Sequence, residues 1–165
     1  MIKKEISQSD CIKLGFGIEK ILKDIILIKN KNLVDIKPIN KKGKKEIDHL
    51  FKDEINKIIY YSELKSNLNL DTEKSKITIE KCLYIFNELK EEYKDYDIKM
   101  FLIGLRYFDK NIIPKNIINK FVIIKENILG INDYLDILNI NYKFENEEEY
   151  IEFINYIIDI MFNKS

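Results

Sequence analysis

The stretch that decides the fold runs from Ile47 to Ser75 and reads IDHLFKDEINKIIYYSELKSNLNLDTEKS. It contains two strand-like runs, at about 46–52 and 57–65, in which apolar residues dominate. Residues 53–56, with the sequence Asp-Glu-Ile-Asn, separate the two runs, and a polar connection of this length is typical of a β-hairpin. The stretch therefore predicts two antiparallel neighbours in a β-sheet.

The segments on either side of this hairpin alternate between helix and strand. Residues Ser9–Asn30 carry isoleucine and leucine at helical spacing, and Asn32–Lys37 is typical of a short strand. After the hairpin, residues 73–93 show a second helical pattern, and the continuous apolar run Ile98–Phe108 is typical of a central strand. The order α-β-β-β-α-β predicts a single α/β domain with a mixed β-sheet core.

The last third of the chain is expected to be mainly helical. Pro114 opens a short helix, and the run at 121–124, Phe-Val-Ile-Ile, is interpreted as a strand. Another short helix begins at 132–133. A final amphipathic helix covers about 146–162, with three glutamates in its first turn, where the helix dipole favours negative charge.

Length and composition exclude several classes of function. A chain of 165 residues fits one domain, and 28 basic against 28 acidic residues give no polycationic surface for nucleic acid. DNA binding stays open, because carboxylates can lie inside a cleft with lysines around it. Two cysteines and the single His49 exclude a disulfide framework, a zinc spacing and a His-rich metal site. The sequence contains neither a phosphate-binding P-loop nor a dinucleotide fingerprint.

The ends of the two hairpin strands carry the candidate chemistry. Residues i and i+2 of a strand share a face, so Glu63 and Lys65 point the same way while Leu64 points into the core. If the strands pair, Asp48 lies near Glu63. Two converging carboxylates repel each other unless a cation joins them, and hard oxygen ligands suit Mg²⁺. The pattern Glu-x-Lys also occurs at 88–90 and 92–94, but there it lies in a predicted helix, where i and i+2 diverge.

Asp48 followed by Glu63-Leu64-Lys65, on adjacent strands between two helices, resembles the core of the PD-(D/E)xK nucleases. The phrases KKEIDHLF at 44–51 and ELKSNLNLDTEKS at 63–75 are similar to small type II restriction endonucleases, and GINDYL at 130–135 is similar more weakly. The chain departs from the family pattern at Ile47, where many members carry proline.

The resemblance implies roles for individual residues. Asp48, Glu63 and the backbone carbonyl of Leu64 would be ligands of Mg²⁺, and Lys65 would be the catalytic lysine. Many family members add an acid from the first helix, and Glu19 is the candidate here. The implied fold is restriction-endonuclease-like, with about 9–108 as the catalytic core.

Other residues have a weaker case. Glu46 shares a face with Asp48 and could replace it, whereas His49 faces away and is interpreted as structural. Arg106, at the end of the predicted central strand, could read a guanine or form a salt bridge. Tyr60 and Tyr61 are expected in the core or cleft wall. The remaining candidates are Thr72, Lys74 and the basic loop 41–45. They could contact phosphates, or they could be a helix cap and a surface loop.

The sequence thus predicts a Mg²⁺-dependent type II restriction endonuclease acting on double-stranded DNA at a short, roughly palindromic site. One active site per chain implies a homodimer, with residues 109–165 supplying dimerisation or DNA recognition. A Holliday-junction resolvase and a catalytically idle DNA-binding subunit remain alternatives. No apolar run reaches the roughly 18 residues of a membrane span, and the start lacks the apolar region of a signal peptide, so a cytoplasmic location is expected.

Overall fold

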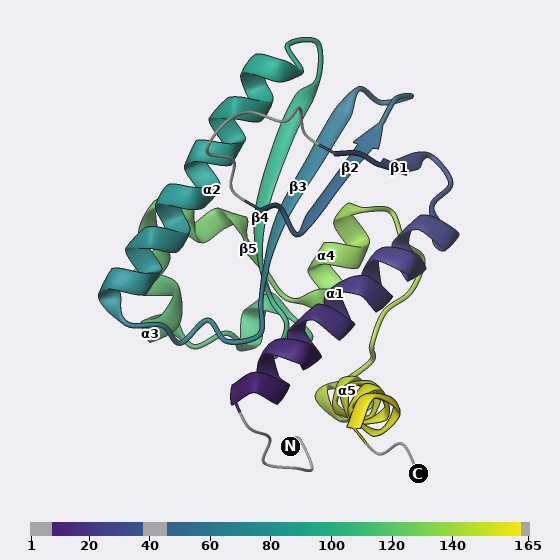
Figure 1. Ribbon diagram of the computed structural model, residues 1–165, viewed down its shortest axis with the longest axis vertical. Coiled ribbons are helices and arrows are strands. Elements are labelled where there is room, and N and C mark those ends of the chain that lie inside the picture. Colours follow the sequence, from purple (N-terminus) through teal and green to yellow (C-terminus); the bar gives the residue numbers. More distant parts are fainter. Residues whose placement is uncertain (1–7, 38–45, 163–165) are drawn as a thin grey trace.

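The computed structural model describes residues 8–37 and 46–162, with side chains from residue 13 onward. Within these residues the chain forms a mixed five-stranded sheet covered by helices on both faces (Figure 1). The strands are β1 (Leu33–Asp35), β2 (His49–Asp53), β3 (Ile58–Lys65), β4 (Asp97–Gly104) and β5 (Ile128–Leu129). The helices are α1 (Gln8–Lys29), α2 (Thr72–Glu92), η1 (Lys110–Ile112), α3 (Lys115–Ile118), η2 (Asn119–Asn127), α4 (Ile131–Ile137) and α5 (Glu147–Phe162), with η for the 3₁₀ segments.

The predicted hairpin is confirmed. Strand β2 pairs antiparallel with β3, with His49 opposite Ser62 and Asp53 opposite Ile58. The carboxylate of Asp53 closes the turn, because it accepts hydrogen bonds from the backbone N–H of Asn56 at 3.0 Å and from the side-chain amide of the same residue at 2.8 Å. Strand β2 begins at His49, three residues later than predicted, so Asp48 lies just before it.

The spatial order of the strands is their order in the chain, from β1 at one edge to β5 at the other. β2 is antiparallel to both of its neighbours, β1 and β3, and α2 then returns the chain so that β4 lies parallel to β3, with Glu63 beside Leu102. This confirms the predicted α/β fold with the order α-β-β-β-α-β and a helical last third. Strand β3 has parallel and antiparallel neighbours and is buried along nearly its whole length, which fits its continuous apolar run.

The predicted central strand 98–108 is correct only in its first part. It ends at Gly104, where an added Cβ would meet the Leu68 side chain at 2.7 Å, so the chain passes close to the loop that follows β3. Arg106 therefore lies two residues beyond the strand, on an exposed turn, and not at its end. The apolar residues after Gly104 pack into the core from a loop.

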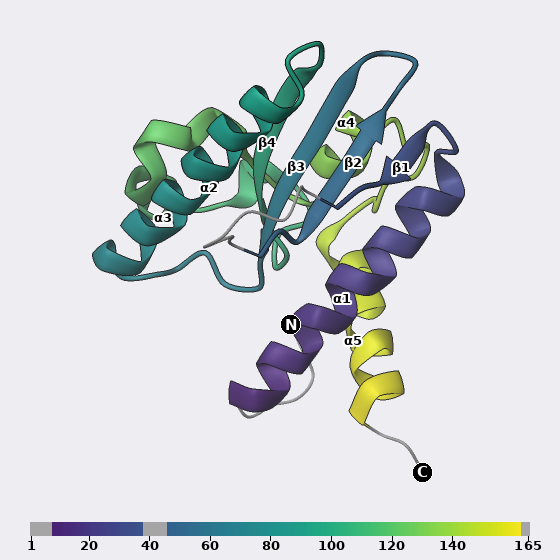
Figure 2. The ribbon, with the colours of Figure 1, turned by 45° about the horizontal axis from the view of Figure 1, so that its top comes forward.

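Each face of the sheet has its own apolar core. One core joins the sheet to α1, α4 and α5, and includes Leu22, Phe51 and Ile154. The other joins the sheet to α2, α3 and η2, and includes Tyr61 and Leu102. Seen in two views, α1 and α5 lie side by side on one face of the sheet while α2 covers the other (Figures 1 and 2). The result is a three-layer arrangement of helix, sheet and helix.

The last third of the chain supplies helices to both cores. The helices predicted near Pro114, near 132 and over 146–162 are confirmed as α3, α4 and α5. The strand predicted at 121–124 is wrong, because this run lies in the 3₁₀ segment η2. Phe121 and Ile124 are buried there, whereas Val122 and Ile123 are 60% and 71% exposed. Burial at every third residue is the period of a 3₁₀ helix and not of a strand.

Within residues 8–37 and 46–162, no helix is both long enough and apolar enough to cross a bilayer.

Candidate functional site

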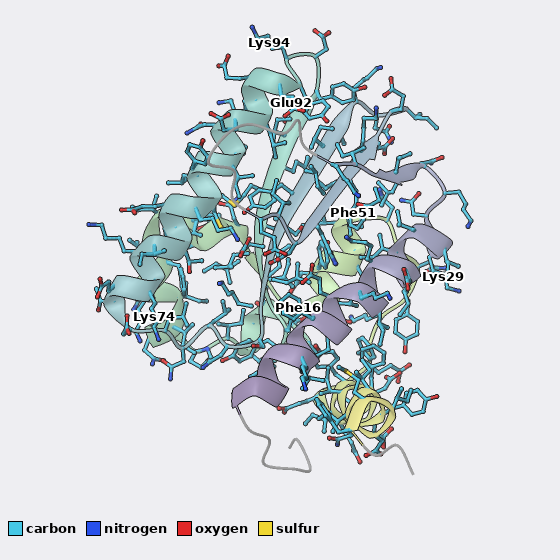
Figure 3. All side chains as sticks on the ribbon, viewed as in Figure 1. Phe16, Lys29, Phe51, Lys74, Glu92 and Lys94 are labelled. Atoms are coloured by element: carbon cyan, nitrogen blue, oxygen red, sulfur yellow. The ribbon has the colours of Figure 1, made fainter. Side chains whose placement is uncertain are left out.

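An open pocket of about 240 Å³ lies where β3 ends, beside the start of β2 and the first half of α1. Its walls bring together acidic, basic and apolar side chains from segments far apart in the sequence. The lining residues are Gly15, Phe16, Glu19, Glu46, Asp48, Glu63, Leu64, Lys65, Ser66 and Leu105. All four acidic or basic residues that the sequence singled out for chemistry, Asp48, Glu63, Lys65 and Glu19, therefore line one pocket. Figure 3 labels Phe16, which marks the place where α1 passes this end of the sheet.

Asp48 is fixed by the backbone of the neighbouring strand. One of its carboxylate oxygens accepts a hydrogen bond from the Leu64 N–H at 2.8 Å. The β2–β3 register, continued by one residue beyond His49, places Asp48 opposite Glu63. Burial and then the negative charge of Glu63 raise the pKa of Asp48 from 3.8 to about 6, against the opposing Leu64 hydrogen bond. The predicted proximity of the two carboxylates is thus confirmed.

Glu63 is the most deeply buried acid of the pocket, with a side chain only 3% exposed. Its Oε2 accepts a hydrogen bond from the Tyr61 hydroxyl at 3.2 Å. Its Oε1 faces two ammonium groups, those of Lys81 at 2.8 Å and of Lys65 at 3.8 Å. A buried carboxylate needs such partners, because an uncompensated charge in a protein interior is very costly.

The alternation of strand β3 distributes the functional groups as predicted. Leu64 is buried in the core that contains α1, while Glu63 and Lys65 share the opposite face. The Lys65 carbonyl accepts a hydrogen bond from Leu105 at 2.9 Å, on the β4 side. Because successive peptide carbonyls of a strand point to opposite sides, the Leu64 carbonyl points to the side of Asp48. Two of the three oxygen donors proposed for a cation, the Leu64 carbonyl and Asp48, thus lie on the same side of β3.

Glu19 reaches the pocket from α1. Burial, followed by the charge of Asp48, raises the pKa of its carboxyl from 4.5 to about 7, although Lys23 acts in the opposite direction. Glu46 and Glu63 add smaller effects of the same sign as Asp48. Glu19 is therefore electrostatically part of the acid cluster, and its proton is exchangeable near neutral pH.

His49 holds the helical turn that carries Glu19. Its ring is fully buried, with Nε2 2.9 Å from the Glu19 carbonyl oxygen and Nδ1 2.6 Å from the Tyr134 hydroxyl. A carbonyl only accepts, so Nε2 carries the proton and Nδ1 accepts from Tyr134. Burial lowers the pKa of His49 from 6.5 to about 4, which keeps the ring neutral. His49 is thus a structural link between β2, α1 and α4.

The remaining candidates are spread around the site or away from it. Glu46 lines the pocket but is exposed. Thr72 and Lys74 are exposed at the start of α2, and the basic loop 41–45 lies outside the described residues. The Glu-x-Lys triplets at 88–90 and 92–94 lie at the C-terminal end of α2, where Figure 3 shows Glu92 and Lys94 far from Phe16.

Lys81 is the site residue that sequence reasoning missed. The buried stripe of α2 contains Thr78 and Ile85, and Lys81 is three residues from the first and four from the second. A lysine at this spacing lies beside the helix face that packs on the sheet. This position in the sequence could have indicated an ion pair for Lys81, because a charged residue there needs a partner on the sheet.

The donor set of the pocket fits a hard divalent cation. Asp48 and Glu63 offer carboxylate oxygens at close range, the Leu64 carbonyl offers a third oxygen, and the mutual repulsion of the acids would be relieved by positive charge. Across the described part of the chain, no cluster of three or more His, Cys, Asp or Glu side chains is arranged to hold a metal ion. A cation here would therefore depend on two carboxylates, a backbone oxygen and water, a set that Mg²⁺ accepts.

Comparison of the chain with known proteins gave no match to a family model, to a curated protein or to a solved structure. The geometry of the pocket is therefore the basis for a functional proposal.

Proposed function

We propose that the protein is a Mg²⁺-dependent DNA endonuclease of the PD-(D/E)xK type, and in particular a type II restriction endonuclease that acts as a homodimer. One observation carries the proposal. Asp48, Glu63 and Lys65 meet in one open pocket at the end of β3, with the two acids close enough for one to raise the pKa of the other. Two carboxylates and an ammonium at one point are suited to hydrolysis of a phosphodiester.

Each group has a distinct part in that reaction. Asp48, Glu63 and the Leu64 carbonyl would hold the cation, which when bound stabilises charge on a phosphate oxygen and lowers the pKa of a water molecule. Lys65 has a side chain 34% exposed in the pocket, so its ammonium can orient the attacking water. The oxygen of that water bonds to phosphorus, one phosphorus–oxygen bond of the DNA backbone breaks, and the leaving oxygen takes up a proton. Glu19, with a pKa near 7, is suited to accept a proton from the water.

The shape of the site favours a polymer substrate. The pocket is open to solvent, and exposed Phe16 stands at its wall with 58% of its surface accessible. A DNA strand can pass across such an opening. One pocket per chain cuts one strand, so cleavage of both strands requires two copies, and two-fold symmetry of the dimer matches a palindromic site.

Digestion of two DNA substrates in Mg²⁺ tests the proposal. Unmethylated plasmid should give discrete fragments whose sequenced ends share one motif, and the matched variant Glu63→Gln should give none. A synthetic four-way junction serves as the second substrate. Symmetric nicking of the junction with intact plasmid would favour a Holliday-junction resolvase, and no cleavage of either would favour an idle DNA-binding subunit.

Glu19→Gln separates a role in the reaction from a role in folding. The raised pKa of Glu19 means that its ionised form is disfavoured in the folded state, so removing the charge should stabilise the protein by about 1–2 kcal/mol at pH 8. The gain should shrink as the pH falls through 7, because Glu19 of the parent then becomes neutral, and it should vanish below pH 4.5. Urea unfolding at several pH values measures this effect.

The same variant should cut DNA more slowly than the parent while binding it equally well, since Gln cannot accept the proton. Cleavage rates and DNA binding in Ca²⁺ provide the two measurements. Unchanged turnover would remove Glu19 from the reaction and leave it as an acid of the pocket wall.

A further inference from the structure

Lys81 makes the closest ionic contact in the site. It reaches across from α2, and its Nζ lies 2.8 Å from Glu63 Oε1, a full ångström closer than the Nζ of Lys65. Its side chain is 22% exposed, against 34% for Lys65. Burial alone would lower the pKa of the Lys81 ammonium, but the hydrogen bond and charge of Glu63 outweigh it, so the pKa lies above its usual value.

The two lysines approach Glu63 from different directions. Lys65 lines the open pocket, whereas Lys81 is not among the lining residues and contacts Glu63 from the α2 side. Tyr61 supplies the third contact, through its hydroxyl, to the other carboxylate oxygen. Glu63 is thus held by positive charge and a hydroxyl, and Lys81 is the nearest charge.

A divalent cation at Glu63 would be repelled by an ammonium hydrogen-bonded to the same oxygen. Charges of the same sign a few ångströms apart repel strongly at a partly buried site. The cation and Lys81 therefore compete for one carboxylate. Lys81 extends to Glu63 from a neighbouring helix, whereas Lys65 is two residues from Glu63 on the same strand.

We propose that Lys81 is the internal counter-ion of Glu63. Its ammonium takes the place of a divalent cation until one binds, and the bound cation then displaces the ammonium from Glu63 Oε1. Lys81 is then a positioning residue: it holds the Glu63 side chain in place, and it sets the affinity of the site for the cation. The inference rests on the proposed function only in taking Glu63 as a ligand of a divalent cation.

Thermal unfolding of Lys81→Met, with and without Mg²⁺ and without DNA, tests the proposal. Without the cation this variant should unfold at a lower temperature than the parent, because it leaves Glu63 buried with one ammonium fewer. Mg²⁺ should raise its unfolding temperature more than that of the parent, since the cation restores the missing charge and binds about tenfold more tightly or better. A Lys81→Met chain that is unfolded alone and folds on addition of Mg²⁺ gives the same support.

Three matched variants complete the experiment. Lys76→Met removes an exposed charge from the same helix and should respond to Mg²⁺ like the parent. Lys65→Met should respond less than Lys81→Met, because its ammonium lies farther from Glu63. In the double variant Glu63→Gln/Lys81→Met the extra response to Mg²⁺ should disappear.

The proposal is overturned if Lys81→Met responds to Mg²⁺ no more than Lys76→Met, if Lys65→Met responds as strongly, or if Lys81→Met stays unfolded in Mg²⁺. These outcomes are independent of the nuclease assignment, which the parent protein tests by cutting plasmid. If the parent cuts DNA but the unfolding temperature of Lys81→Met does not respond to Mg²⁺, only the role of Lys81 is rejected. If Lys81→Met shows the expected response to Mg²⁺ but the parent cuts no DNA, only the nuclease assignment is rejected.

Discussion

Asp48→Asn, Glu63→Gln and Lys65→Met are each expected to slow plasmid cleavage in Mg²⁺ by about 10³-fold or more while the protein remains folded. Removing one preorganised charge from a reacting site lowers the rate on the order of 10²–10³-fold. Where several groups act as one unit, removing any one of them loses most of the rate enhancement of the whole unit. Asp48 and Glu63 are already coupled, because the charge of Glu63 raises the pKa of Asp48. Initial rates on supercoiled plasmid measure the loss, and circular dichroism checks the fold.

The chain contains matched controls for this experiment. Glu88→Gln and Glu92→Gln alter the same Glu-x-Lys pattern on α2, at the end of the sheet opposite the pocket, and should cut like the parent (Figure 3). Near-normal rates in any two of the three site variants would show that the site is misassigned. Loss of cleavage in a folded Glu88→Gln would point to α2 instead of β3.

His49→Ala is expected to cost about 3–5 kcal/mol of stability at neutral pH. The change leaves a cavity in the core and removes the partners of the buried Tyr134 hydroxyl and of the Glu19 carbonyl. Urea unfolding measures the loss, and Tyr134→Phe should produce a smaller one, because it removes one hydrogen bond and leaves the ring in place. A loss below about 1 kcal/mol in His49→Ala would contradict the anchoring role.

Lowering the pH should reduce the stability that His49 contributes by linking β2, α1 and α4. The pKa of His49 is lowered to about 4 in the folded protein, against 6.5 when unfolded, so only the unfolded chain takes up this proton between those values. The contribution of His49 is complete above pH 6.5 and is lost as the pH falls towards 4, by about 3 kcal/mol in total. Glu19 and Asp48, with raised pKa values, change stability in the opposite sense. The stability difference between the parent and His49→Ala, followed from pH 7.5 to 4, therefore isolates the histidine, and a constant difference would contradict this assignment.

The hairpin and its acids could be predicted because local patterns determine them. An apolar run of strand length, a short polar turn and strict alternation place Glu63 and Lys65 on one face, whatever the rest of the chain does. The pairing then brings Asp48 to Glu63. Glu19 needed the resemblance to a known family, since nothing local distinguishes it from other acids on α1; its place follows from the contact between His49 and the Glu19 carbonyl, which joins residues 30 positions apart.

The errors came from apolar runs whose structure depends on tertiary packing. Residues 121–124 contain four apolar residues in a row, a pattern shared by strands and by short buried helices. Only the contact of η2 with α2 and the sheet selects Phe121 and Ile124 for burial. Lys81 was missed for a related reason, because lysine on a helix is ordinarily solvated, and its partner Glu63 lies on a different element.

Because α1 packs against α5, α1 leaves the ribosome long before the helix that covers it. Leu14 and Ile18 of α1 share a core with Ile154 and Ile158 of α5, and the two helices lie side by side (Figure 2). At about 5–20 residues per second, α1 spends on the order of ten seconds without this partner during translation. Its apolar stripe lacks this cover for that time, and a chain truncated before residue 147 has an uncovered core.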